Sequence, residues 1–167
     1  MKAKKITLMA LLTAIALIIF IVEARIPNPI PIPGVKLGLA NIVTVYSMFV
    51  LGPWPTLMVL FSRVLLGSIF SGQMMMFFYS MGGGLLCYAS MLFMRKLVTR
   101  KQIWAASVIG AIFHNIGQII VAILITRTPG LIAYLPFLIV SGILAGAFTG
   151  LCAQFVVHRL PGIKDIQ

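Results

Sequence analysis

Acidic residues are almost absent from this chain. Only Glu23 and Asp165 carry a carboxylate among 167 residues, against 13 lysines and arginines, and the formal net charge is +11. Two acids that lie so far apart in the sequence exclude the paired carboxylates of general acid–base hydrolysis. They also exclude a cluster of acidic oxygen ligands for a divalent cation.

Cysteines and nucleotide-binding motifs are equally scarce. Cys87 and Cys152 are the two cysteines, and both lie inside apolar runs, where they are expected to be small core residues. The chain contains no Walker motif and no Ser/His/Asp or Cys/His arrangement with plausible spacing. We therefore expect a protein that is not an enzyme and that holds no metal or cofactor.

Apolar residues are what the chain has in excess. They make up 61% of it, charged residues make up 9%, and the mean hydropathy is +1.13, whereas a soluble domain is about 45–50% apolar and about 25% charged. A water-soluble fold cannot bury this much apolar surface, so the bilayer must be the solvent. The positive charge then indicates loops that face anionic lipid, and no nucleic-acid partner is expected.

The apolar runs predict an all-α integral membrane protein with six spans. One span takes about 20 residues, so residues 1–167 form a single transmembrane domain with no room for a soluble one. Prolines at alternate positions make residues 26–34 an extended loop, and three consecutive glycines at 82–84 are expected to interrupt the fourth span. The predicted spans are about residues 6–22, 36–51, 56–70, 74–94, 103–126 and 133–157.

The positions of the cations predict the orientation of these spans. With the N-terminus in the cytoplasm, nine of the 13 cations lie in inner segments, three lie in outer segments, and Arg63 lies within a span. An excess of lysine and arginine marks cytoplasmic loops. The count therefore supports six helices in the plasma membrane with both termini cytoplasmic and with the proline-rich loop outside.

Two ionisable side chains are predicted to lie near the middle of the membrane. Counting from the inner ends of their spans, Arg63 is roughly 13 Å deep and His114 roughly 16 Å deep. Helical spacing places Asn115 and Gln118 on the same face as His114. Arg63 either holds an anionic group of a ligand or bonds to helix carbonyls, Asn115 or water and so locks the bundle. The same two alternatives, ligand contact or interhelical hydrogen bonding, stand for the His114 face.

A second polar group lies where the first two spans meet the proline-rich loop. Glu23 is near the outer end of the first span, roughly 10 Å from the depth of Arg63, so direct pairing of the two requires the loop to fold inward. Lys36 and Asn41 begin the second span. Together these residues form either a polar lid over an outward-facing pocket or a solvated loop with a snorkelling lysine.

Small residues at helical spacing predict close packing. Ala10 and Ala14 form a small-xxx-small motif that is suited to contact with another subunit, whereas Gly142, Gly146 and Gly150 are expected to pack within the bundle. The two halves show no convincing inverted repeat, and no membrane acid is present to carry a coupling proton. Both observations argue against a secondary transporter that acts alone.

Five stretches of the chain form a recognisable set, at residues 32–42, 63–67, 71–72, 82–84 and 110–118. The most specific are PGVKLGLAN and HNIGQ. Together these stretches resemble the Gx transporter family, whose members are often labelled heptaprenyl diphosphate synthase component I, and the resemblance covers nearly the whole chain.

That family is in turn similar to the substrate-binding S components of energy-coupling factor (ECF) transporters. The resemblance implies a six-helix protein whose site opens outward beneath the loop between helices one and two. It also implies two partner ATPase subunits and a T subunit that docks on the Ala10/Ala14 surface. The expected ligand is a small anionic or polar micronutrient, or a compound related to quinones, isoprenoids or flavins. Since the chain lacks the aspartate-rich motif of polyprenyl synthases, the alternative is a non-catalytic accessory protein of polyprenyl diphosphate or quinone synthesis, or of extracellular electron transfer.

Overall fold

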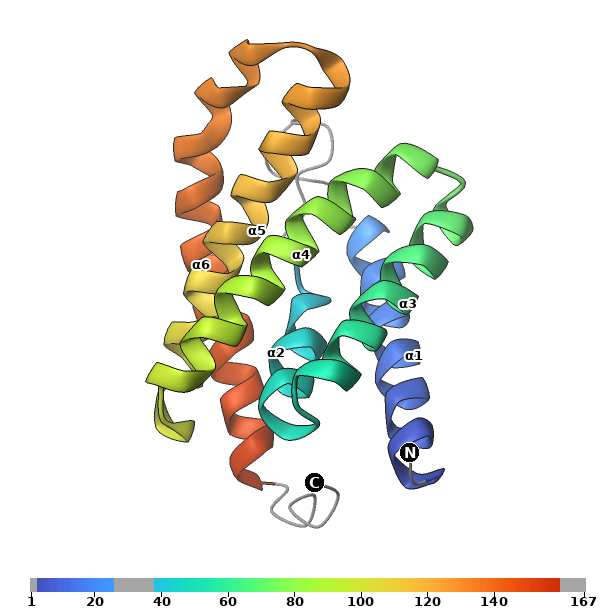
Figure 1. Ribbon diagram of the computed structural model, residues 1–167, viewed down its shortest axis with the longest axis vertical. Helices are drawn as coiled ribbons and strands as arrows, with labels where there is room; N and C mark the ends of the chain where they lie inside the picture. Colours follow the sequence, from blue (N-terminus) through green and yellow to red (C-terminus); the bar gives the residue numbers. More distant parts are fainter. Residues whose placement is uncertain (1–2, 26–37, 160–167) are drawn as a thin grey trace.

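In the described residues, six α-helices form a membrane-protein bundle, which Figure 1 shows with its long axis vertical. The computed structural model describes residues 3–25 and 38–159. Within these ranges, five helices are long and apolar enough to cross a membrane, which confirms the all-α, multi-pass class. The helices are α1 (Ala3–Arg25), α2 (Asn41–Val50), α3 (Pro53–Ser71), α4 (Met74–Leu97), α5 (Ile103–Thr126) and α6 (Leu135–Arg159), with 3₁₀ turns η1 (Arg100–Gln102) and η2 (Pro129–Tyr134).

The second helix differs most from its prediction. We expected a span over 36–51, but α2 has ten residues, and at 1.5 Å per residue it covers about half of a hydrocarbon core of about 30 Å. It begins late because Gly38 has a left-handed φ of 72°, and its N–H bonds to the Glu23 carboxylate rather than to a helix carbonyl. Eight of the ten residues of α2 are buried, so this short helix forms the centre of the bundle rather than a lipid-facing wall.

Two other expectations about helix boundaries were wrong. The third span was predicted to begin at about residue 56, but Pro53 begins α3 after Gly52, whose φ is 91°. Proline fits the first turn of a helix because the N–H that it lacks would have no intrahelical partner there. The glycines at 82–84 were expected to interrupt the fourth span, yet α4 runs through them without a break.

Glycines allow α4, α5 and α6 to pack closely. A Cβ on Gly117 of α5 would lie 2.6 Å from the Gly82 carbonyl oxygen of α4, and one on Gly150 of α6 would lie 2.6 Å from the Trp104 Cα of α5. Gly146 makes a similar approach to the Val108 Cα of α5, where a Cβ would lie at 2.8 Å, and a Cβ on Gly142 would lie 2.8 Å from Asn115 Nδ2. The predicted role of the α6 glycines in the bundle is therefore confirmed, and packing against α5 explains why glycines inside α4 do not break it.

The basic ends of the helices lie together. Figure 1 shows the start of α1, the end of α4 and the end of α6 at one end of the bundle. These ends carry cations of the predicted inner segments, including Lys4, Lys5, Arg95, Lys96 and Arg159. This clustering agrees with the predicted orientation, while the side of the membrane on which it lies stays a prediction.

Candidate functional site

Arg63 lies about halfway along α3 and carries an incompletely bonded guanidinium. Its Nη2 donates a hydrogen bond to Asn41 Oδ1 at 2.8 Å, whereas its Nε is buried and has no hydrogen-bond partner among the described residues. A buried donor without a partner costs about 1–3 kcal/mol, and more when it is charged. Asn115, which we considered as a partner that would lock the bundle, does not bond to Arg63. The guanidinium bonds instead to Asn41, the first residue of α2.

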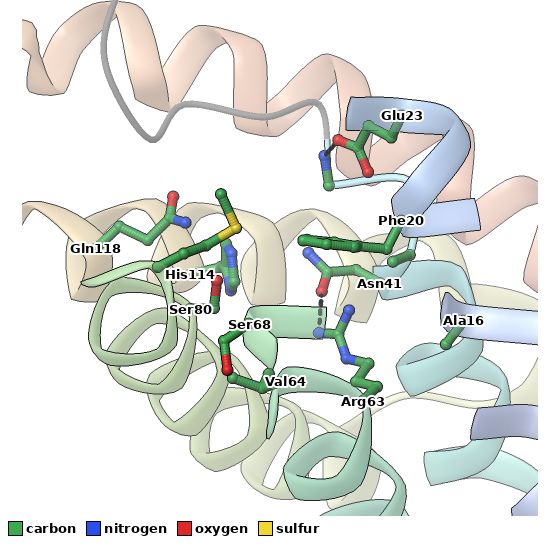
Figure 2. A pocket seen from close by; sticks show the side chains of 13 residues that line it. Ala16, Phe20, Glu23, Asn41, Arg63, Val64, Ser68, Ser80, His114 and Gln118 are labelled. Atoms are coloured by element: carbon green, nitrogen blue, oxygen red, sulfur yellow. Dashed lines mark hydrogen bonds between the residues drawn. The ribbon is translucent and has the colours of Figure 1, made fainter. Parts of the chain in front are cut away.

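A polar cavity of about 50 Å³ lies beside this guanidinium. Figure 2 shows side chains from α1 and α3 converging there with side chains from α4 and α5. The start of α2 supplies the rest of the wall. The lining residues are Ala16, Phe20, Glu23, Gly38, Ala40, Asn41, Arg63, Val64, Ser68, Met76, Ser80, His114 and Gln118.

His114 reaches the cavity from the opposite wall. Its Nδ1 is buried and, within the described part of the chain, forms no hydrogen bond. The ring fits because α4 has Gly83 beside it: a Cβ there would lie 3.0 Å from His114 Cε1 and 2.8 Å from Gln118 Cγ. The glycine run that we expected only to break a helix therefore makes room for two of the predicted site residues.

Asn115 does not belong to this site. Its side-chain amide donates to the Leu138 carbonyl oxygen at 2.5 Å, between α5 and α6, and it packs against Gly142. The prediction of a shared face is right for His114 and Gln118, which line the cavity, and wrong for Asn115. One residue further along a helix turns a side chain by about 100°, which is enough to aim Asn115 at α6.

Glu23 lies closer to the site than its depth predicted. Glu23 is 4% exposed, its carboxylate accepts a hydrogen bond from the Gly38 N–H at 2.5 Å, and it lines the same cavity as Arg63. The roughly 10 Å separation in depth is overcome because α2 begins midway through the bundle, so the chain at Gly38 returns inward. The cavity therefore contains groups of both charge signs.

The remaining predicted residues lie away from the cavity or outside the described residues. Ala10 and Ala14 are exposed on α1 and do not line the cavity. Lys36 falls outside the described residues. Sequence reasoning missed Phe20, Ser68 and Ser80, which line the cavity; aromatic and serine residues in apolar helices carry no distinguishing signal, so their role follows only from the packing.

The size of the cavity limits what it holds in this conformation. Small-molecule sites measure about 300–1,000 Å³, whereas 50 Å³ accommodates only one or two molecules of the size of water, each of which takes about 30 Å³ in the liquid. A larger ligand therefore needs a wider cavity than this conformation provides.

Comparison with known proteins identifies a family for this chain. The family model of heptaprenyl diphosphate synthase component I matches residues 12–156, which include all the residues that line the cavity. No curated protein and no solved structure matches the chain.

Proposed function

This chain belongs to the heptaprenyl diphosphate synthase component I family, and from that premise we propose that it is a substrate-binding membrane subunit. In this proposal it is the S component of an ECF transporter, located in the plasma membrane. It takes up a small anionic or polar micronutrient, or a compound related to quinones, isoprenoids or flavins. Two ATPase subunits and a T subunit supply the energy, and the protein itself is not an enzyme.

One observation carries the proposal. Arg63 Nε and His114 Nδ1 are both buried without a hydrogen-bond partner in the described residues, and both side chains line one cavity from opposite walls. A buried nitrogen that lacks a partner in the protein is costly in a membrane, and a ligand that bonds to both nitrogens removes that cost.

The surrounding groups define the ligand by its chemistry. The guanidinium of Arg63 suits a carboxylate or phosphate oxygen, while His114 and Gln118 suit a polar ring edge or a hydroxyl group. Glu23 balances the charge of Arg63 across the cavity. A ligand with a single anionic group beside neutral polar groups therefore fits better than a polyanion.

The exposed face of α1 supports the partner assignment. Ala10 and Ala14 are exposed, one turn apart, and leave the backbone accessible to another helix. Replacing both with leucine is expected to abolish copurification with the T subunit while ligand binding persists. Unchanged copurification would contradict this docking surface.

Native mass spectrometry of the purified protein, searching for a retained small molecule, tests the binding role. We expect the wild-type protein to retain one ligand, and Arg63→Ala and His114→Ala to lose it although both proteins stay inserted. The control is Ser107→Ala/Thr149→Val, which removes a 3.2 Å hydrogen bond between α5 and α6 that lies away from the cavity. Equal ligand retention in all variants, or equal loss in the control, would show that the polar cluster only holds the bundle together.

The family description favours one second candidate, a non-catalytic accessory protein that brings a soluble prenyl synthase or flavoprotein to the membrane. The contact would be the basic end of α4 and the turn after it, where Lys96 and Lys101 are exposed. Loss of recruitment on neutralising residues 95–101, with no dependence on Arg63 or His114, would favour this candidate over the transporter subunit.

A further inference from the structure

A second cavity, larger and apolar, lies away from the polar site. It is an open groove of about 480 Å³ bounded by α1, α2 and α6. Aliphatic side chains and Tyr46 form its walls, and none of the charged cavity residues contributes. The lining residues are Leu8, Leu11, Leu12, Ile15, Ile19, Ile42, Val43, Tyr46, Ala153 and Val156.

The groove exists because α2 is short and buried. Both α1 and α6 pack on α2, and Figure 1 shows α2 between them, towards the end of the bundle where α1 begins and α6 ends. The ten-residue helix supplies the floor, and the two longer helices supply the walls. Because its lining is apolar, the groove suits contact with the hydrocarbon of the bilayer rather than with water.

Its length matches one leaflet of the membrane. From Leu8 to Ile19 the α1 wall rises roughly 16 Å at 1.5 Å per residue, and half of a hydrocarbon core of about 30 Å is about 15 Å. The α6 wall, Ala153 and Val156, belongs to the last two turns of that helix. The groove thus occupies the half of the membrane next to the start of α1 and the end of α6. Its length matches that of one extended acyl chain.

Cations mark the end of the groove that meets the headgroups. Lys4 and Lys5 lie four and three residues before Leu8, so they continue the groove-lining face of α1 by one turn. Arg159 lies three residues beyond Val156 and is held over the Phe155 ring at 5.3 Å. Glu23, the one acid in the described residues, is at the opposite end of α1.

We propose that this groove is a binding site for one anionic phospholipid, with an acyl chain in the groove and the phosphate between Lys4 and Lys5. An apolar wall one leaflet long and a basic mouth complement the two parts of such a lipid. The site is separate from the proposed docking surface, because Ala10 and Ala14 point roughly 140° around α1 from the centre of the groove-lining residues. It does not depend on the proposed transport function.

Native mass spectrometry with added lipids tests the site directly. Phosphatidylglycerol and phosphatidylcholine with identical chains are titrated into the purified protein. We expect the protein to bind one molecule of phosphatidylglycerol tightly and to bind phosphatidylcholine much more weakly. Since a cation near the membrane surface contributes about fivefold to anionic lipid affinity, Lys4→Gln/Lys5→Gln should weaken phosphatidylglycerol binding roughly 25-fold. Arg95→Gln/Lys96→Gln, which removes two cations at the same end of the bundle, should leave it unchanged.

A groove-filling pair of variants tests the acyl-chain half. Ile15 and Ile21 are similarly exposed on α1, at 39% and 42%, but only Ile15 lines the groove. We expect Ile15→Trp to weaken phosphatidylglycerol binding at least tenfold and Ile21→Trp to leave it unchanged.

Three results would overturn the site. They are equal affinity for the two lipids, wild-type binding in both the lysine and the Ile15 variants, or displacement of phosphatidylglycerol by a polyprenyl phosphate at lower concentration. The last result would assign the groove to an isoprenoid instead. The lysine variants change only surface charge, so we expect them to fold as the wild-type protein does. Size-exclusion profiles and helical circular dichroism identical to those of the wild-type protein check this for each variant.

Discussion

The two halves of the bundle are built by different means. In α4, α5 and α6, glycines bring backbones together, and the polar side chains Ser107, Asn115 and Thr149 bond between helices. In α1, α2 and α3, no comparable run of glycines is present, and the polar groups Glu23, Asn41 and Arg63 gather at a cavity instead. Polar side chains thus complete the hydrogen bonds between α5 and α6, whereas those around the cavity leave some polar atoms unbonded.

This difference indicates how the site could work. Helices α4, α5 and α6 pack closely against one another, and this packing holds His114 and Gln118 at the wall of the cavity. The α1–α3 half meets it across the cavity, where Arg63 Nε and His114 Nδ1 remain without partners in the described residues. Opening to admit a ligand is therefore expected at the boundary between the halves and not within the glycine-packed contacts.

The largest effect is expected from Gly117→Leu. Its side chain would have to enter a space in which even a Cβ lies 2.6–2.9 Å from the backbone of Gly82 and Gly83. Because backbone atoms cannot move aside individually, α4 and α5 should separate and folded protein should be lost, as measured by monodisperse yield after purification. Gly130→Ala, at a position with open space, is the control. A normal yield of Gly117→Leu would mean that the close-packed half is not required for folding.

Asn115→Ala should destabilise the same half more moderately. It removes the hydrogen bond to the Leu138 carbonyl between α5 and α6, and an interhelical hydrogen bond in a membrane is worth about 0.6–1.7 kcal/mol. The melting temperature in detergent should fall while ligand binding per folded molecule is kept. Loss of binding without loss of stability would place Asn115 in the site after all.

Gly38→Ala tests the junction between α1 and α2. The left-handed φ of 72° costs a residue with a Cβ about 1–2 kcal/mol, and the added atom would lie 2.9 Å from Asn41 Nδ2. We expect faster hydrogen exchange in the first turn of α2 and weaker ligand binding, because Asn41 positions Arg63. Exchange rates identical to those of the wild-type protein would show that this turn tolerates the substitution.

The smallest stability effect is expected from Arg63→Met. The substitution loses one hydrogen bond to Asn41 and the charge opposite Glu23, but it also removes a buried guanidinium whose Nε has no partner among the described residues. Glu23 keeps its hydrogen bond from the Gly38 N–H, so we expect the loss and the gain to offset each other in large part. The melting temperature should therefore change less than that of Asn115→Ala, although ligand binding is lost. A larger destabilisation than that of Asn115→Ala would assign Arg63 to bundle locking and remove the contrast between the halves.

The membrane class, the number of helices and most helix positions could be predicted from the sequence. Long apolar runs must be helical in a bilayer, because each backbone polar group needs a partner within its own segment. The same reasoning found Arg63 and His114, since ionisable residues inside apolar runs stand out from their neighbours. It failed for α2, where a left-handed glycine and the Glu23 carboxylate, fifteen residues away, set the start of the helix.

The sequence by itself determined that this is a membrane protein and which family it belongs to. It also showed which few polar side chains lie within apolar helices and therefore need a partner. Only the tertiary structure decided which of them meet. His114 and Asn115 are adjacent in the chain, yet one faces the cavity and the other faces α6. The physical reason is that helical spacing gives only the direction in which each side chain leaves its own helix. Which neighbouring helix that side chain then meets depends on how closely the glycines let the helices approach one another.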